Sequence, residues 1–178
     1  MKNKAHAAAP VIETQRLRLR GFTAADLPAF CALWNDPQVY RHITGTPLHE
    51  EDQWTRLLKI AGHWQFVGFG SWAITDKASG TLIGQCGFND YRRDMDIPMP
   101  EPEMGWALRG DHQGKGIGYE ANRAAITWFE SEIGRQTLAC IIDPANAASQ
   151  GLAQKLGFRQ VAETAYRQKP TVLFHRQT

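Results

Sequence analysis

Three glycines and a lysine lie close together in the stretch HQGKGIGYE, residues 112–120, and their spacing suggests a binding site for phosphate. Glycines let the backbone approach a ligand closely and let successive amides point in one direction. A helix that begins near Ile117 exposes about four unpaired N–H groups, which attract anions. Only Asp111 is near enough to cap that helix. The residues alone leave two interpretations open, a phosphate-binding turn and a flexible surface loop.

Two common phosphate motifs do not fit this turn. A Walker loop needs GxxxxGK followed by Ser or Thr, but the glycines of GDHQGKG are one residue too close, and Gly116 stands in place of the hydroxyl. The dinucleotide fingerprint GxGxxG does not match glycines spaced evenly at 114, 116 and 118, and the strands around them are not a parallel series. The pattern that does fit is Q-x-x-G-x-G, formed by Gln113, Gly116 and Gly118.

The elements around this turn can be predicted from the spacing of apolar residues. Strands are expected at residues 16–22, 71–76, 81–90, 103–110, 137–143, 159–166 and 171–176. Helices are expected at residues 23–36, 49–66, 116–134 and 146–158. The three prolines of residues 92–102 predict a loop. This order predicts an α/β (α+β) domain with an antiparallel run followed by a βαβ unit. We expect one domain at residues 11–178 after a flexible segment at 1–10.

Three motifs in order give the chain a resemblance to a known family. The Q-x-x-G-x-G turn between a strand and a helix resembles the coenzyme A loop of the GNAT superfamily of N-acetyltransferases. ETQRLRLRGF, PEMGWALRGDHQGKGIGYEA and NAASQGLAQKLGF are similar to the start, centre and last helix of its RimJ/RimL-type branch. The last motif is matched by Asn146, Ser149, Lys155, Gly157 and Phe158. The resemblance implies a mixed central sheet of about six or seven strands with about four helices and two splayed parallel strands at its centre.

The resemblance also implies how acetyl-CoA, the cosubstrate, would bind. The pantetheine arm would insert between strands 103–109 and 137–143 and bond to the backbone of Trp106, Ala107 and Leu108, much as an added strand would. An N–H of the first strand would hold the oxyanion of the tetrahedral intermediate. The pyrophosphate would lie on the amides of Gln113, Gly114, Lys115, Gly116, Ile117 and Gly118. No metal is needed for this chemistry.

Two side chains are the candidates for proton transfer. Glu103, at the start of the central strand, is the candidate base, with Glu101 as a substitute; a solvated strand-end carboxylate is the alternative interpretation. Relatives often place a tyrosine in the last helix to protonate the leaving thiolate, but that position corresponds to Ala153. Ser149 is therefore the candidate donor, as in the RimJ/RimL-type branch, with Tyr119 and Tyr91 as weaker candidates. Asn146 would cap this helix and contact the coenzyme.

The acceptor implied by the resemblance is a primary amine, either a protein N-terminus or a small amine. The alternative is a catalytically weak coenzyme A-binding module with a regulatory role. Asp94, Asp96 and Glu101 could attract a cationic amine or be simply solvated. The aromatic cluster His63, Trp64, Phe66, Phe69 and Trp72 could line the acceptor pocket, although aromatic residues at this density usually form core.

Composition narrows the function classes further. A net charge of +2 over 178 residues argues against nucleic acid or an anionic membrane as the main partner. No apolar run reaches the length of a membrane span. The three cysteines have no CxxC pairing, which favours a reducing, cytoplasmic location and a packing role over catalysis. No histidine lies at a metal-ligand interval from them. A homodimer is compatible with this composition.

Overall fold

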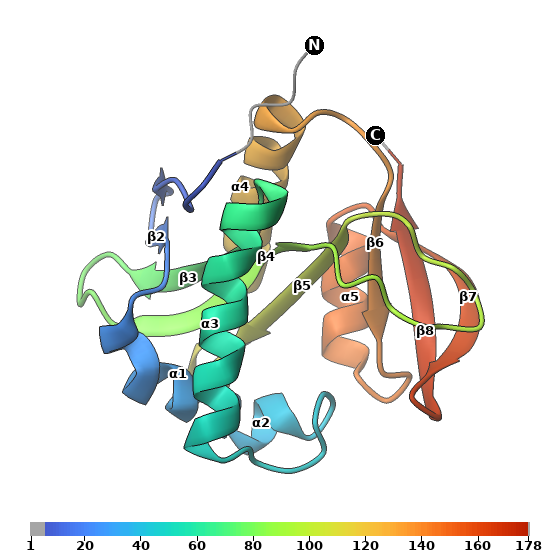
Figure 1. The fold of residues 1–178 in the computed structure, drawn as a ribbon, viewed down its shortest axis with the longest axis horizontal. Coiled ribbons are helices and arrows are strands. Elements are labelled where there is room, and N and C mark those ends of the chain that lie inside the picture. Colours follow the sequence, from blue (N-terminus) through green and yellow to red (C-terminus); the bar gives the residue numbers. More distant parts are fainter. Residues whose placement is uncertain (1–5, 178) are drawn as a thin grey trace.

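The computed structural model describes residues 6–177, which form one mixed sheet of eight strands with helices on both faces (Figure 1). The strand order is β1-β2-β3-β4-β5-β6-β8-β7, and every neighbouring pair is antiparallel except β5 and β6. The strands are β1 (Ile12–Glu13), β2 (Leu17–Arg20), β3 (Ser71–Asp76), β4 (Leu82–Asn89), β5 (Glu103–Leu108), β6 (Leu138–Ile142), β7 (Arg159–Tyr166) and β8 (Lys169–Arg176). The α+β class and the parallel central pair are confirmed.

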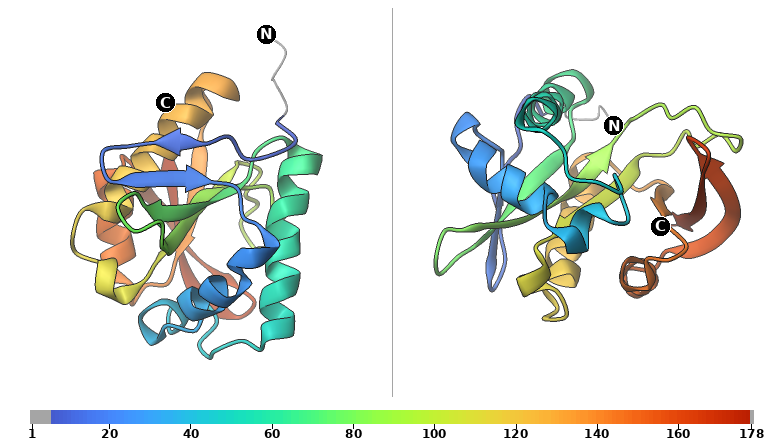
Figure 2. Two further views of the ribbon diagram at one scale, coloured as in Figure 1. Left: turned by 90° about the vertical axis from the view of Figure 1, so that its left-hand side faces the viewer. Right: turned by 90° about the horizontal axis from the view of Figure 1, so that it is seen from below.

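Five α-helices cover the sheet. They are α1 (Leu27–Trp34), α2 (Pro37–Tyr40), α3 (Glu50–Val67), α4 (Ile117–Glu132) and α5 (Ala147–Lys155), with 3₁₀ turns at Ala24–Asp26 and Gly110–His112. Helices α1 and α3 lie on one face, and α4 and α5 lie on the other (Figure 2). The α1–α3 side buries a smaller apolar cluster, whereas the α4–α5 side buries the main core.

The structure adds two short elements that the sequence did not predict. The sheet has eight strands and not six or seven, because the two-residue β1 pairs with β2 and is too short to show a periodic pattern. The helix expected at residues 23–36 is present as the 3₁₀ turn and α1, and Asp36 then caps the additional helix α2 by accepting a hydrogen bond from the Gln38 N–H at 2.8 Å. Pro37 lacks an N–H and suits the first position of a helix, so it begins α2.

Most of the aromatic cluster from residues 63–72 is core. The Trp64 and Trp72 side chains are buried and meet edge to face with ring centroids 4.8 Å apart, and Trp128 of α4 joins both. Phe66 points away and is 90% exposed. The Trp72 indole N–H also donates to the Pro10 carbonyl at 2.8 Å. Residues 6–10 of the expected flexible segment are thus in contact with the domain, and residues 1–5 lie outside the described residues.

Cys86 and Cys140 are buried in the main core as expected, and burial raises the pKa of both thiols. They therefore stay protonated and act as small apolar side chains. Within residues 6–177 there is no helix long and apolar enough to cross a membrane, and no group of three or more His, Cys, Asp or Glu side chains is placed to hold a metal ion.

Candidate active site

The site is organised by the divergence of two parallel strands. Strands β5 and β6 share a single registered pair, Glu103 with Ala139, next to a hydrogen bond from the Ala139 N–H to the Pro102 carbonyl at 3.1 Å. Beyond that pair the strands separate, while β5 stays paired with β4 along its whole length. One edge of β5 is therefore without a strand partner from Met104 onward.

Alternation along β5 decides which backbone groups face that open edge. The Arg109 N–H donates to the Ile83 carbonyl of β4 at 2.9 Å, and the register continues unbroken to Glu103. In an antiparallel pair, successive residues direct their backbone groups to opposite sides. Met104, Trp106 and Leu108 therefore face the gap, and Ala107 faces β4. Sequence reasoning missed Met104, which the alternation adds to the expected Trp106 and Leu108.

The glycine turn follows directly from the end of β5. The Gln113 side-chain amide donates to the Leu108 carbonyl at 2.8 Å and holds the turn against the strand. Gly114 and Gly116 both have positive φ, 73° and 75°, a backbone region that glycine tolerates and other residues rarely adopt. Gly114, Lys115 and Gly116 are exposed, Ile117 is buried as the first residue of α4, and Gly118 is half-buried.

Helix α4 begins without a side-chain cap. Its N-cap residue is Gly116, which has no side chain to accept from the first N–H groups of the helix. Asp111, the only nearby capping candidate in the sequence, bonds instead to His112 at 2.7 Å and Arg109 at 3.0 Å. The first amides of α4 therefore remain available to an anionic ligand, with the helix dipole adding positive potential.

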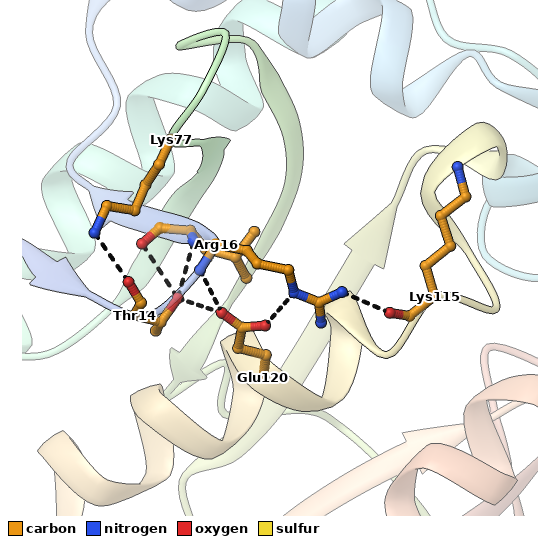
Figure 3. A network of polar contacts seen from close by, with 6 residues as sticks. Thr14, Arg16, Lys77, Lys115 and Glu120 are labelled. Atoms are coloured by element: carbon orange, nitrogen blue, oxygen red, sulfur yellow. Dashed lines mark hydrogen bonds and ion pairs between the residues drawn. The ribbon is translucent and has the colours of Figure 1, made fainter.

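A network of polar contacts fixes the far side of the turn (Figure 3). Glu120, in the first turn of α4, accepts from the Thr14 hydroxyl at 2.6 Å, from the Arg16 N–H at 2.9 Å and from Arg16 Nε at 2.7 Å. Arg16 Nη1 in turn donates to the Lys115 carbonyl at 2.9 Å. The segment between β1 and β2 thereby holds the glycine turn. This contact could not be predicted from the local sequence pattern.

Helix α5 forms the other wall of the gap. Asn146 caps it as expected, since its Oδ1 accepts from the Ser149 N–H at 3.0 Å. The Ser149 hydroxyl accepts a hydrogen bond from the Trp106 indole N–H at 3.3 Å, so a side chain of β5 meets α5 across the gap. Ala153, at the position where relatives often have tyrosine, is fully buried.

Glu103 is buried and fully engaged. Arg93, from the loop between β4 and β5, forms a two-point contact with it: Nε bonds to Oε2, and Nη2 bonds to Oε1 at 2.8 Å. The Arg93 guanidinium lies over the Tyr91 and Tyr166 rings at 4.6 and 4.5 Å. Glu103 is thus a paired carboxylate and not the solvated strand-end residue of the alternative interpretation.

The other candidates for proton transfer lie at the edges of this arrangement. Desolvation and the Glu103 carboxylate raise the pKa of Tyr91, and the guanidinium groups of Arg93 and Arg56 oppose that rise. Tyr119 is on the exposed side of α4. Glu101 lies 3.9 Å from His175 of β8. Tyr91 contacts the Glu103–Arg93 pair, because the Arg93 guanidinium lies over its ring.

Splayed parallel strands, an uncapped glycine turn and a capped wall helix together define an acyl-coenzyme A-dependent transferase fold. Residues 16–159 match the acetyltransferase (GNAT) domain family, and the chain belongs to that family. It is accordingly an N-acetyltransferase, and the family uses acetyl-CoA as its acetyl donor.

Individual proteins agree with this assignment. The chain is 27% identical over 148 residues to the uncharacterised N-acetyltransferase p20 of Bacillus licheniformis, covering 83% of this chain and 81% of that protein. A Bordetella pertussis structure assigned to the GnaT family is 31% identical with a TM-score of 0.82, covering 94% of this chain and 99% of that one. RimL, a ribosomal L7/L12 α-N-protein acetyltransferase solved in complex with coenzyme A, has a TM-score of 0.76 at 16% identity, covers 94% and 98%, and shows the shared fold.

Proposed function

We propose that this protein transfers the acetyl group of acetyl-CoA to a primary amine by direct attack within a ternary complex. The observation that carries the proposal is the single pair joining β5 to β6, which leaves a strand edge open beside the uncapped start of α4. That combination offers hydrogen bonds for an extended amide chain and a positive helix end for phosphates in one continuous path.

The coenzyme would follow this path from α4 to the centre of the sheet. Amides of Gln113–Gly118 take the pyrophosphate, and Asn146 contacts the coenzyme from the start of α5. The backbone groups of Met104 and Trp106 bond to the pantetheine amides. The Leu108 carbonyl contributes less, because the Gln113 side chain already donates to it.

Ser149 is proposed as the proton donor to the leaving thiolate. As the C–N bond forms and the C–S bond breaks, the sulfur gains a negative charge that a hydroxyl can neutralise by hydrogen bonding or proton transfer. Ser149 is held at the gap by the contact of its own N–H with Asn146, and its hydroxyl already meets Trp106. No other hydroxyl on α5 faces β5 across the gap within the described part of the chain.

The acceptor amine must lose a proton, and Glu103 is proposed as the base. Neutralising a lysine side chain at pH 7 costs about 4.6 kcal/mol, whereas an α-amine costs only about 1 to 1.4 kcal/mol. A carboxylate acting directly or through water is sufficient for the second case. Both Glu103 oxygens bond to Arg93, and each keeps a second lone pair that can accept a proton from the amine or from a bridging water.

The acceptor is proposed to be a protein N-terminus or a small amine. RimL, which has the same fold, is an acetyltransferase of a ribosomal protein α-amine and is the precedent for the first kind of acceptor. The decisive experiment incubates the protein with acetyl-CoA and a panel of peptides, polyamines and amino acids and measures the coenzyme A thiol that is released. Coenzyme binding with no acetylated amine would favour a regulatory coenzyme-binding module.

A further inference from the structure

Four buried polar atoms, on α1, α3 and β4, have no hydrogen-bond partner among residues 6–177. They are Trp34 Nε1, Gln53 Oε1, Arg56 Nη1 and Gln85 Oε1. Leaving a buried donor or acceptor unsatisfied costs about 1–3 kcal/mol each, and more for a charged group. Such a group calls for a physical explanation, and here all four lie away from the coenzyme path, which runs along the edge of β5.

One direct contact and two relations of position connect the four residues. The Arg56 guanidinium lies 3.8 Å above the Trp34 ring. Gln53 precedes Arg56 by three residues on α3, so the two side chains are neighbours on the helix surface. Gln85 of β4 is paired with Ala107 of β5, and Ala107 packs in the same apolar cluster as Trp34. We name these four residues the polar corner.

The polar corner adjoins open space over the centre of β5. Gly105 is two residues from both Glu103 and Ala107 and shares their side of the strand. A β-carbon added at Gly105 would meet no atom within 4 Å, and its partner across the sheet, Gly87, has no side chain either. A small group can therefore lie above Gly105, beside Glu103, on the face opposite α4 and α5.

Charge decides what kind of group would lie there. Glu103 and Arg93 neutralise each other, but Arg56 forms no ion pair within residues 6–177, and its neighbour Tyr91 is neutral because the pKa of that phenol is raised. Burial of this unpaired charge lowers the pKa of Arg56. Asp94 and Asp96, in the loop between β4 and β5, line a separate cleft with Arg167. The polar corner thus has an excess positive charge that a ligand can balance.

We propose that the polar corner binds an anionic group of the acceptor, so that the substrate is an amine with a neighbouring carboxylate. This inference rests on the proposed acetyl transfer. Arg56 Nη1 and Trp34 Nε1 supply two N–H donors to the carboxylate, and the Gln85 amide oxygen accepts from the ammonium near Gly105. Two sources share this chemistry, a free amino acid and a peptide N-terminus with an acidic residue next to it.

The test compares matched acceptors in a coenzyme A thiol-release assay. One arm uses free amino acids and their carboxamides, and the other uses tripeptides that differ only by Asp against Asn at position two. We expect KM to be about tenfold to a hundredfold lower for the acid of at least one arm, which then identifies the source. The inference is overturned if amines without an anion are acetylated equally well in both arms.

Arg56→Gln supplies the second readout, with Lys59→Gln, an exposed charge one turn along α3, as the matched control. In Arg56→Gln the acid-to-amide ratio of KM should collapse towards one, and comparing the ratio within each variant cancels the different basicities of the two amines. Arg56→Lys should keep part of the preference, because it keeps the charge but loses the planar fork. An unchanged ratio in Arg56→Gln would refute the assignment.

Measurements of Tm and of ligand binding distinguish anion binding by Arg56 from a packing role. They also distinguish a failure of this inference from a failure of the proposed function. Removing an unpaired buried charge should leave Tm unchanged or raise it, whereas a role confined to packing on Trp34 predicts a lower Tm. An N-acetyl amino acid should raise the Tm of the wild type but not that of Arg56→Gln. If the wild-type protein does not bind acetyl-CoA, the proposed function is contradicted. If it acetylates amines without preferring those that carry an anion, only this inference is contradicted.

Discussion

Replacing Glu120 by glutamine tests whether the network in Figure 3 positions the glycine turn that is proposed to bind the coenzyme. The substitution keeps the side-chain shape but removes the charge that binds the Thr14 hydroxyl and both the backbone and side chain of Arg16. Hydrogen bonds to charged groups contribute about 1.5–3 kcal/mol, against about 0.5–1.5 kcal/mol for neutral pairs. Because Arg16 is nearly half exposed, we expect a loss of about 1–2 kcal/mol in the free energy of unfolding.

This loss corresponds to a fall in Tm of about 2–8 °C for a chain of this size. The substitution should also weaken the binding of acetyl-CoA, for a reason separate from its effect on stability. Arg16 Nη1 holds the Lys115 carbonyl at 2.9 Å, and a turn released from that contact must be ordered again on binding. Ordering one residue costs about 1–2 kcal/mol, which raises the KM for acetyl-CoA by roughly fivefold to thirtyfold. Scanning calorimetry and coenzyme titration measure the two quantities independently.

The effect of Glu120→Gln on Tm should depend on pH in a direction that can be checked. Partial burial of Glu120 opposes its ionisation, but hydrogen bonds from Thr14 and Arg16 and the Arg16 charge together lower the pKa of Glu120. A carboxyl whose pKa is lower in the folded state contributes stability above its unfolded value, near 4.5, and loses it as the pH falls through the folded value. The difference in Tm between wild type and Glu120→Gln should therefore shrink below pH 4.5.

Glu13→Gln is the matched control, since Glu13 of β1 makes exposed ion pairs with Arg18 of β2 and with Lys77 in the β3–β4 turn. Such pairs contribute little, so its Tm should change by no more than about 2 °C. If Glu120→Gln and Glu13→Gln have the same Tm and the same KM for acetyl-CoA, the network does not position the turn.

Three further substitutions address the proposed site. Gly116→Val should raise the KM for acetyl-CoA at least tenfold, whereas Gly80→Val, which has a similar φ of 71° in the β3–β4 turn, should cost stability alone; equal coenzyme titrations would refute the phosphate-binding turn. Ser149→Ala should lower kcat by about tenfold to a hundredfold with KM nearly unchanged. Ser131→Ala, on the outside of α4, should change neither kcat nor KM. Glu103→Gln should lower kcat most at low pH, where the amine needs a base; a pH–rate profile that overlays that of the wild type would place the base elsewhere.

The pairing of Glu103 with Arg93 connects the proposed base to the loop between β4 and β5. A guanidinium that holds both oxygens and lies over two tyrosine rings keeps the loop between β4 and β5 against the centre of the sheet. In Figure 1 this loop crosses β6 and β8 on the face that carries α3.

Local features of the fold could be predicted because they depend on neighbouring residues. The glycine turn, the start of α4 at Ile117 and the Asn146 cap each follow from side chains within a few positions. The strands β3 and β4 and the helix α3 were placed within about one residue for the same reason. The two-residue β1 and the short α2 were missed, because each depends on a single pairing or cap and not on a period.

The sequence by itself determined the class of this protein, since the three motifs and the order of the elements identify an N-acetyltransferase. Only the tertiary structure decided what each side chain meets. Glu120 bonds to Arg16 across 104 residues, Trp106 meets Ser149 across 43, and Arg56 lies over Trp34. Such contacts arise from the packing of whole elements, so no local period or spacing encodes them.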